Sequence, residues 1–201
     1  VLFRSVWQTT PRPLFLEQML KNGSDVNYAD RNGNTLLMYA SGYEPQKYGF
    51  LPGKGNYSSA DYAKLFLRYD ADVSQQNKEG WTALDYAVQL DDDMAAMNLL
   101  LSYGAEVTPV VLSHALDFEG AYTHYQRIHK LVALLDSSQT STILTPIFDA
   151  AIRGDNATVQ ELATKTDLSE AERLQTLCHA VAFCNADTVR LLLADGFGTI
   201  Q

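Results

Sequence analysis

The side chains best suited to chemistry are four histidines and two cysteines, and their spacing decides what they could do. Cys178 and Cys184 are six positions apart, and His124 and His129 are five apart. Neither is the short interval that zinc sites use. Cys178 and His179 are neighbours, and adjacent residues of a helix point about 100° apart, so they are poorly placed for a nucleophile and its base. We therefore predict no metal, no cofactor and no catalytic residue.

Two other segments resemble ligand-binding loops at first sight, but a structural role explains each of them better. The acidic run 91–93 lacks the alternating ligands, the glycine bend and the distal glutamate of a calcium loop. Because it precedes an apolar helical stretch, we interpret it as capping a helix N-terminus. The segment Gly53-Lys54-Gly55 is too short for a phosphate-binding loop and is not followed by serine or threonine. We expect a plain loop there.

Composition points to a folded protein of one or two domains. The chain has 201 residues, of which 46% are hydrophobic and 19% charged, with a formal net charge of −9. That charge disfavours a nucleic-acid partner, since the basic residues are scattered singly. No apolar run reaches the roughly 18 residues of a membrane span. Two cysteines are compatible with a reducing cytosol, so a cytoplasmic location is favoured.

The first residues do not resemble a natural start. The chain opens on Val1-Leu2-Phe3-Arg4-Ser5 without an initiator methionine. The string Leu-Phe-Arg-Ser is similar to the translation of a sequencing-adapter end. We interpret the chain as a fragment from environmental (metagenomic) sequence, with residues 1–12 non-native or irregular; a trimmed natural segment is the alternative.

Two sequence elements recur along the chain and position everything else. The first ends an apolar helix, and its copies are Asn22-Gly23-Ser24-Asp25-Val26-Asn27, Tyr69-Asp70-Ala71-Asp72-Val73-Ser74 and Tyr103-Gly104-Ala105-Glu106-Val107-Thr108. The second begins a helix, and its clearest copies are Gly33-Asn34-Thr35-Leu36-Leu37-Met38-Tyr39-Ala40 and Gly80-Trp81-Thr82-Ala83-Leu84-Asp85-Tyr86-Ala87. Residues 145–151 are a third copy, and residues 175–181 are a weaker fourth. Self-similarity at a period near 34 residues, as from Asp70 to Gly104, is the signature of a repeat protein.

Each repeat has the local chemistry of a helix–turn–helix–loop unit. Thr35, Thr82 and Thr145 stand where a first helix begins and can cap its free amides. Pro146 occupies a first helical position, where a missing N–H costs nothing. Glycines at positions 23, 104 and 196 end the second helix in a left-handed conformation, and those at 33 and 80 serve the turn before the next first helix. This combination predicts stacked helix pairs.

The two elements together resemble the ankyrin repeat, most closely over Gly80 to Thr108. The resemblance implies an all-α solenoid of stacked antiparallel helix pairs with short hairpin loops. It also implies a non-catalytic role in protein binding. The family's histidine position holds Met38, Asp85, Phe148 and Cys178 here. We expect these copies to lose the hydrogen bond that the histidine makes, and Cys178 to be a buried thiol.

We divide residues 13–201 into one array of five to six unequal units. The predicted bounds are 13–29 (partial), 30–75 (with an inserted loop at 43–58), 76–108, 109–142 (degenerate), 143–173 and 174–201. In the degenerate unit we expect helices near 110–116 and 125–135.

The resemblance also implies where a partner would bind. Ankyrin arrays use the hairpin tips and the exposed side of the first helices as a concave face. The variable helix position is occupied here by Tyr39, Tyr86, His114, Asp149 and His179. Trp81 extends this surface, and Asn32, Asn34, Lys78 and Glu79 are expected at the tips. The two tyrosines are candidate binding anchors; ordinary packing between repeats is the alternative.

The insertion at 43–58 is the second candidate surface. Its glycines and prolines predict a loop, yet it carries four aromatic residues: Tyr43, Tyr48, Phe50 and Tyr57. They could determine partner specificity or cover the exposed end of the array. The sequence thus favours a monomeric protein-binding scaffold. A targeting array of a larger enzyme or effector and a purely structural spacer are the alternatives.

Overall fold

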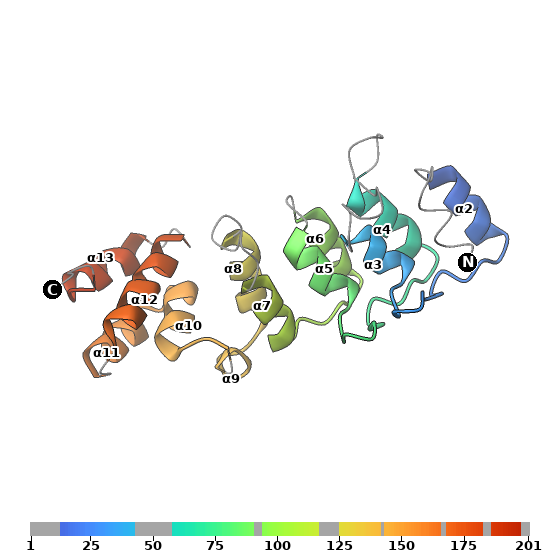
Figure 1. Ribbon diagram of the computed structural model, residues 1–201. Helices are drawn as coiled ribbons and strands as arrows, with labels where there is room; N and C mark the ends of the chain where they lie inside the picture. The colour runs from blue at the N-terminus through green and yellow to red at the C-terminus, as the bar shows by residue number, and fades with distance from the viewer. Residues whose placement is uncertain are drawn as a thin grey trace. The chain divides into compact units, whose positions relative to one another are not determined.

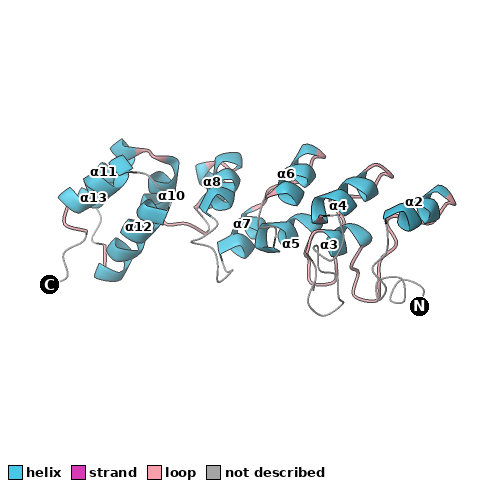
Figure 2. Cartoon of the chain, turned by 90° about the horizontal axis from the view of Figure 1, so that it is seen from above, coloured by secondary structure: helices cyan, strands magenta, loops and turns pink. Residues whose placement is uncertain are grey.

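The structure is a computed structural model that describes residues 13–42, 58–90, 94–116, 125–141, 143–165, 168–182 and 186–197. The described residues form helices joined by turns and loops, with no strand among them (Figures 1 and 2). The fold class is an all-α repeat solenoid, as predicted. The chain divides into two compact units, residues 1–106 and 107–201.

Unit 1 is built from helix pairs in two layers. The first helices are α3 (Leu36–Ala40) and α5 (Ala83–Leu90), which contact each other. The second helices are α2 (Pro13–Lys21), α4 (Ser59–Leu67) and α6 (Ala95–Ser102), of which α4 contacts both others. Each first helix packs on the second helix of its own repeat, α3 on α4 and α5 on α6. The stacking therefore repeats from one pair to the next.

Small and apolar side chains fill the space between these layers. Ala40, Ala63, Ala87 and Ala96 have no exposed surface, which lets the helices approach closely. Phe66 and Leu100 are also fully buried between the pairs. Because an alanine has no side chain beyond Cβ, any larger residue in these positions would separate the helices.

The helix ends in unit 1 follow from local chemistry. Thr35 caps α3, its hydroxyl accepting a hydrogen bond from the Met38 N–H at 3.3 Å. Ser58 and Asp61 form a reciprocal capping box at α4. Gly23 and Gly104 take φ values of +87° and +86° after their helices, as predicted. The equivalent third position is Asp70 at φ +61°, a conformation that L-residues with a side chain seldom adopt.

Unit 2 contains seven helices within the described residues. They are α7 (Pro109–Leu116), α8 (Tyr125–Leu134), α9 (Ser137–Thr140), α10 (Pro146–Arg153), α11 (Asn156–Lys165), α12 (Glu170–Ala182) and α13 (Ala186–Ala194). The helices α7 and α8 confirm those expected in the degenerate repeat. Helix α10 contacts α8, α11 and α12, and α13 contacts α11 and α12. A core of Ile147, Ala151, Val159, Ala180 and Leu192 lies among the last four helices.

Candidate functional site

Two hairpin tips in unit 1 are the most regular exposed features of the repeats. Tip 1 comprises residues 30–34 and tip 2 residues 77–81. Each tip is closed by a backbone hydrogen bond of 2.9 Å, from Asp30 N–H to Asn34 C=O and from Asn77 N–H to Trp81 C=O. Gly33 and Gly80 have φ values of +85° and +83°, which makes the tight reversal possible. The two tips are therefore structural copies of each other.

One polar side chain fixes the inside of each tip. Oδ1 of Asp30 accepts hydrogen bonds from the backbone N–H groups of Asn32 and Asn34, both at 2.8 Å. Oδ1 of Asn77 accepts from the N–H groups of Glu79 and Trp81 at 3.0 and 2.9 Å. Aspartate and asparagine can both do this because only an acceptor oxygen is required.

The two tyrosines of the first helices hold these side chains. The Tyr39 hydroxyl donates to Oδ2 of Asp30 at 2.9 Å. In the next repeat the direction is reversed, and Nδ2 of Asn77 donates to the Tyr86 hydroxyl at 2.8 Å. Both tyrosines lie nine residues after the tip residue that they contact. Each first helix thus anchors the tip that precedes it.

This arrangement corrects the expectation that Tyr86 is a binding anchor. Tyr86 is only 6% exposed and its hydroxyl is engaged with Asn77. A side chain so buried has almost no surface for a partner, so ordinary packing is its role. Tyr39 is half-buried and keeps an accessible edge. Trp81 is also half-buried, and its ring lies 5.0 Å from the Tyr86 ring, tilted by 42°.

Successive tips are joined to each other. The Lys78 N–H donates to the Asn32 C=O at 2.9 Å. Nδ2 of Asn77 also donates to Oδ1 of Asn34 at 2.9 Å. Asn34 lies in tip 1, as expected, but it is only 2% exposed because it meets Asn77. A polar chain runs from Tyr39 through Asp30, Asn34 and Asn77 to Tyr86.

A second link joins the repeats where the second helices end. The Asn27 amide donates to the Asp70 C=O at 3.2 Å and accepts from the Asp72 N–H at 2.8 Å. One side chain thus satisfies two backbone groups of the next repeat. Asn27, Asp30 and Asn77 are not among the site residues predicted from the sequence. Their signal is recurrence: polar residues at equivalent places in copies 47 residues apart.

The electrostatics of tip 1 favour an ionised Asp30. Burial alone would raise the pKa of this carboxyl. Hydrogen bonds from the Asn34 backbone, the Tyr39 hydroxyl and the Asn32 backbone outweigh burial, and the pKa lies below its usual value. The carboxylate of Asp30 is thus a fixed negative charge beneath the tip.

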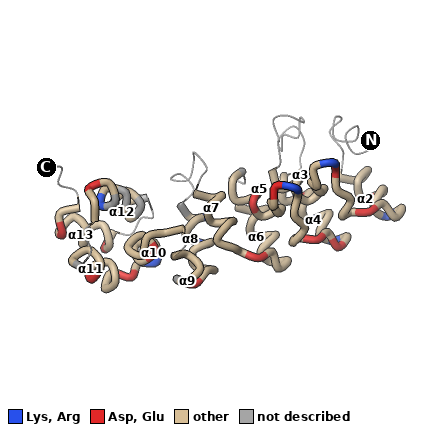
Figure 3. Tube along the Cα trace, turned by 60° about the horizontal axis from the view of Figure 1, so that its bottom comes forward, with Lys and Arg blue, Asp and Glu red and all other residues tan. Residues whose placement is uncertain are grey.

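The outer surface of the tips carries exposed charges of both signs. Arg31 and Asn32 are exposed on tip 1, and Lys78 and Glu79 on tip 2. Figure 3 shows charged residues of both signs on the loops that precede α3 and α5. Because the network beneath them is fixed, these side chains project from a defined backbone. Such loops on a rigid scaffold are where binding residues concentrate.

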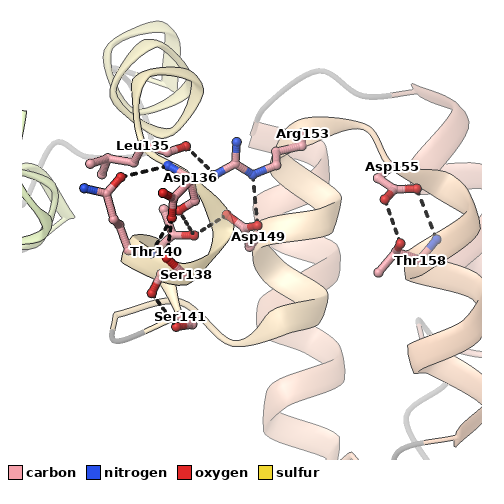
Figure 4. A network of polar contacts seen from close by, with 10 residues as sticks. Leu135, Asp136, Ser138, Thr140, Ser141, Asp149, Arg153, Asp155 and Thr158 are labelled. Atoms are coloured by element: carbon pink, nitrogen blue, oxygen red, sulfur yellow. Dashed lines mark hydrogen bonds and ion pairs between the residues drawn. The ribbon is translucent and has the colours of Figure 1, made fainter.

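Asp149 is used differently, which corrects the expectation that it faces a partner. It is 7% exposed on α10. Its Oδ2 accepts from Nε of Arg153 at 2.9 Å, and its Oδ1 accepts from the Thr140 hydroxyl at 2.8 Å (Figure 4). Arg153 also donates to the Leu135 C=O at 2.9 Å. Asp149 therefore ties α10 to the short helix α9, and Arg153 ties α10 to the residue that follows α8.

The other predicted site residues are only partly accounted for. His114 is half-buried on α7. His179 belongs to α12, but its side chain lies outside what the structure describes, and so do the four loop aromatics. The structure brings Tyr39, Tyr86 and Trp81 together within unit 1, whereas His114, Asp149 and His179 belong to unit 2.

Two expectations about the family's histidine position need correction. Oδ2 of Asp85 accepts from both the N–H and the hydroxyl of Thr82 at 2.7 Å, so a hydrogen bond is made there. The Met38 sulfur accepts more weakly from the Thr35 N–H at 3.5 Å. Cys178 is exposed rather than buried.

Within the described ranges, no group of three or more histidine, cysteine, aspartate or glutamate side chains could hold a metal ion. The acidic run 91–93, the segment 53–55, His124 and Cys184 lie outside those ranges. None of the described helices has the length and apolar character needed to cross a membrane.

Comparison with known proteins agrees with the geometry. Residues 12–110 match the family of ankyrin repeats, in three copies. Residues 12–110 therefore consist of ankyrin repeats, a class of repeat that generally serves in protein interaction. No curated protein matches its sequence significantly.

Solved structures share the fold at low sequence identity. The human ASB11 ankyrin repeat domain is 20% identical, with a TM-score of 0.54 over 96% of this chain and 82% of that one. A chain in the structure of the predatory endopeptidase Bd0816 of Bdellovibrio bacteriovorus in complex with immunity protein Bd3460 is 21% identical. Its TM-score is 0.49, over 95% of this chain and 96% of that one. At this identity the likeness to the ASB11 domain supports the fold alone.

Proposed function

We propose that this chain is a non-catalytic, monomeric scaffold that binds a protein partner through the hairpin tips and adjoining first-helix surface of unit 1. The observation that carries the proposal is the contrast between the exposed tip residues and the buried network below them. Arg31, Lys78 and Glu79 are exposed, whereas Asn34 and Tyr86 are almost fully buried and hydrogen-bonded. A surface fixed in this way loses little conformational entropy on binding.

The proposed contact surface differs from the one expected from sequence. It keeps the accessible edges of Tyr39 and Trp81, adds Arg31 to the exposed tip residues, and omits Tyr86 and Asp149. The segment 43–58, which follows α3 in the sequence, remains part of the proposal as a specificity element. His114 and His179 are retained as candidates on unit 2. The net charge of −9 supports a protein partner over a nucleic acid.

Charge reversal at the tips tests this function. The variant Arg31→Glu/Lys78→Glu changes two exposed tip residues, and its matched control Lys64→Glu/Arg68→Glu changes two exposed residues of the α4 region by the same charge. Immobilised full-length proteins would capture partners from a lysate, with quantitative mass spectrometry as the measurement. We expect proteins retained by the parent and the control to be lost from the tip variant. An identical set on all three would reject the tip surface.

Deletion of residues 44–56 tests the loop separately. Loss of partner with an unchanged free energy of unfolding would support a specificity role. Unchanged capture together with lowered stability would instead assign the loop to covering the array. Sedimentation of the free protein would test the monomeric state.

A further inference from the structure

The two tips differ in what covers their downstream edge, which is the side of tip 1 that meets tip 2 and the equivalent side of tip 2. At tip 1 this edge is covered by tip 2, whose Lys78 N–H donates to the Asn32 C=O at 2.9 Å. The contact is close: a Cβ added at Gly33 would lie 3.0 Å from the Cα of Asn77 and 3.1 Å from the nitrogen of Lys78. The downstream edge of tip 1 is therefore a backbone-to-backbone interface.

Among the described residues of unit 1, none covers the same edge of tip 2, which we call the open edge. Gly80 is the equivalent of Gly33, and a Cβ added there would meet nothing within 4 Å. Glu79 is the equivalent of Asn32, and within the described part of the chain no donor reaches its carbonyl oxygen. Glu79 and Gly80 are both exposed.

The sequence explains why no third tip follows. From Val26 to the start of α3 at Leu36 is ten residues, and from Val73 to the start of α5 at Ala83 is also ten. From Val107 to the start of α7 at Pro109 is only two. The connection is eight residues shorter (10 − 2), which removes the hairpin. The edge that a third tip would cover is therefore left without one.

The residue beside this edge also changes in character. Asn34, in tip 1, is 2% exposed because it meets Asn77 of the following tip. Its equivalent in tip 2 is Trp81, which is half-buried and held against Tyr86 at 5.0 Å between ring centroids. A tryptophan at the edge offers a large, rigid contact area, which is typical of binding surfaces.

We propose that the open edge of tip 2 pairs with an extended segment of a protein partner, which takes the place of the missing third tip. The segment donates a backbone N–H to the Glu79 C=O, lies against the bare Cα of Gly80 and packs a side chain on Trp81. Polypeptide backbone is the ligand because backbone already occupies this edge at tip 1. The pairing adds a chain to an exposed backbone edge. The inference rests on the proposed function and names its partner's chemistry.

A peptide copied from this chain provides the probe. Residues 74–83 contain the tip that covers tip 1, so a capped peptide of that sequence is offered to the isotopically labelled full-length protein. Binding is followed by NMR. We expect the amide signals of Glu79, Gly80 and Trp81 to shift at millimolar peptide. A second peptide, N-methylated at the residue that corresponds to Lys78, lacks the donor and should bind about fivefold more weakly.

Two glycine variants provide the matched test on the protein. Gly80→Asn fills the open space, and Gly104→Asn is the control because its φ of +86° matches +83° and nothing lies within 4 Å there either. Asparagine tolerates this conformation better than most residues. We expect Gly80→Asn to weaken peptide binding at least about tenfold, a loss of roughly 1.4 kcal/mol, and Gly104→Asn to leave it within about twofold.

Several outcomes would overturn the proposal. These are absence of shifts at millimolar peptide, equal binding of the N-methylated peptide, or equal binding by Gly80→Asn. Self-association of the free protein that Gly80→Asn abolishes would assign the edge to a second copy instead. The proposed function can fail separately: partner capture that Arg31→Glu/Lys78→Glu abolishes and Gly80→Asn leaves intact would retain the tip surface and reject this edge. Peptide binding without any tip-dependent capture would retain this edge and reject the tip surface as the site of the proposed function.

Discussion

The same position of the first helix serves two purposes in the two units. In unit 1 it is tyrosine, and Tyr39 and Tyr86 reach toward the side chain that fixes the preceding tip. In unit 2 it is Asp149 on α10, which binds Arg153 and Thr140. Where a hairpin tip is present, the position holds the tip. Where a short capped helix replaces it, the position holds that helix.

A first-helix position that faces the tips is therefore not necessarily a position that contacts a partner. In Tyr39, Tyr86 and Asp149 a polar side-chain atom is hydrogen-bonded to the segment that precedes the helix, whether that segment is a hairpin tip or a short helix. We therefore propose that the tip residues, rather than this position, contact a partner. In unit 1 these are exposed, whereas the anchoring network below them is buried.

The largest effect is expected in unit 2, from Asp149→Ala. The change removes two hydrogen bonds and leaves the Arg153 guanidinium, whose side chain is 27% exposed, without its carboxylate. We expect a loss of about 2–3 kcal/mol in the free energy of unfolding, measured by chemical denaturation. The control is Asp187→Ala, which breaks an ion pair whose side chains are 75% and 78% exposed and should cost under about 0.5 kcal/mol. Equal effects would contradict the anchoring role.

Next comes Tyr86→Phe in unit 1. The change removes the acceptor of one Asn77 hydrogen bond while keeping the ring, at an expected cost of about 1–2 kcal/mol. Tyr39→Phe should cost less because Tyr39 is only half-buried and water can reach the site. The difference in stability loss between the two variants, measured by thermal unfolding, shows how strongly each tyrosine anchors its tip. A larger loss from Tyr39→Phe would mean that tip 1 is the more tightly anchored of the two.

A gain in stability is expected from Asp70→Gly. Asp70 has φ +61° where the equivalent residues of neighbouring repeats are Gly23 and Gly104. Relief of the left-handed strain should add about 0.5–1 kcal/mol, which raises the melting temperature by about 1–4 °C for a chain of this size. The Asp70 carbonyl that Asn27 contacts is retained. The reciprocal change Gly104→Asp should lower the melting temperature, and a rise would contradict this reading of the repeats.

Sequence reasoning found the repeats and most helices because both depend on local patterns. Apolar periodicity, capping threonines and turn glycines are read within a few residues, so α7 and α8 could be placed even in the degenerate repeat. The residues of the candidate site were harder to predict from the sequence. Whether Tyr86 is a contact or a buried anchor depends on Asn77 in the tip before its helix and on the packing around the ring. The same holds for Asp149, whose partners come from α9 and its own helix.

Some local signals were present but were not used. Asp136 and Gln139 form a capping box, and their spacing of three predicts the start of α9. Asp85 also lies three residues after Thr82, which is the spacing of a capping pair. The burial of Asn34, in contrast, follows from a residue 43 positions away in the next repeat. Contacts at that range depend on the register of stacking, which no local pattern specifies.

The smallest effect is a difference in acid sensitivity between the two tips. The Asp30 carboxyl has a folded-state pKa below its usual value, so its contribution to stability is complete above about pH 4, the unfolded value, and is lost as pH falls through the folded value. In tip 2 the equivalent hydrogen bonds are accepted by the side chain of Asn77, which does not titrate. Hydrogen exchange of the Asn34 amide should therefore accelerate relative to that of Trp81 as the pH falls below about 4, once the intrinsic pH dependence is removed. The variant Asp30→Asn gives tip 1 the chemistry of tip 2, because the amide oxygen can accept both backbone N–H groups and its NH2 can donate to Tyr39. We expect that variant to abolish the difference at a cost of under about 1 kcal/mol at neutral pH. Persistence of the difference in Asp30→Asn would mean that another group controls the acid response of tip 1.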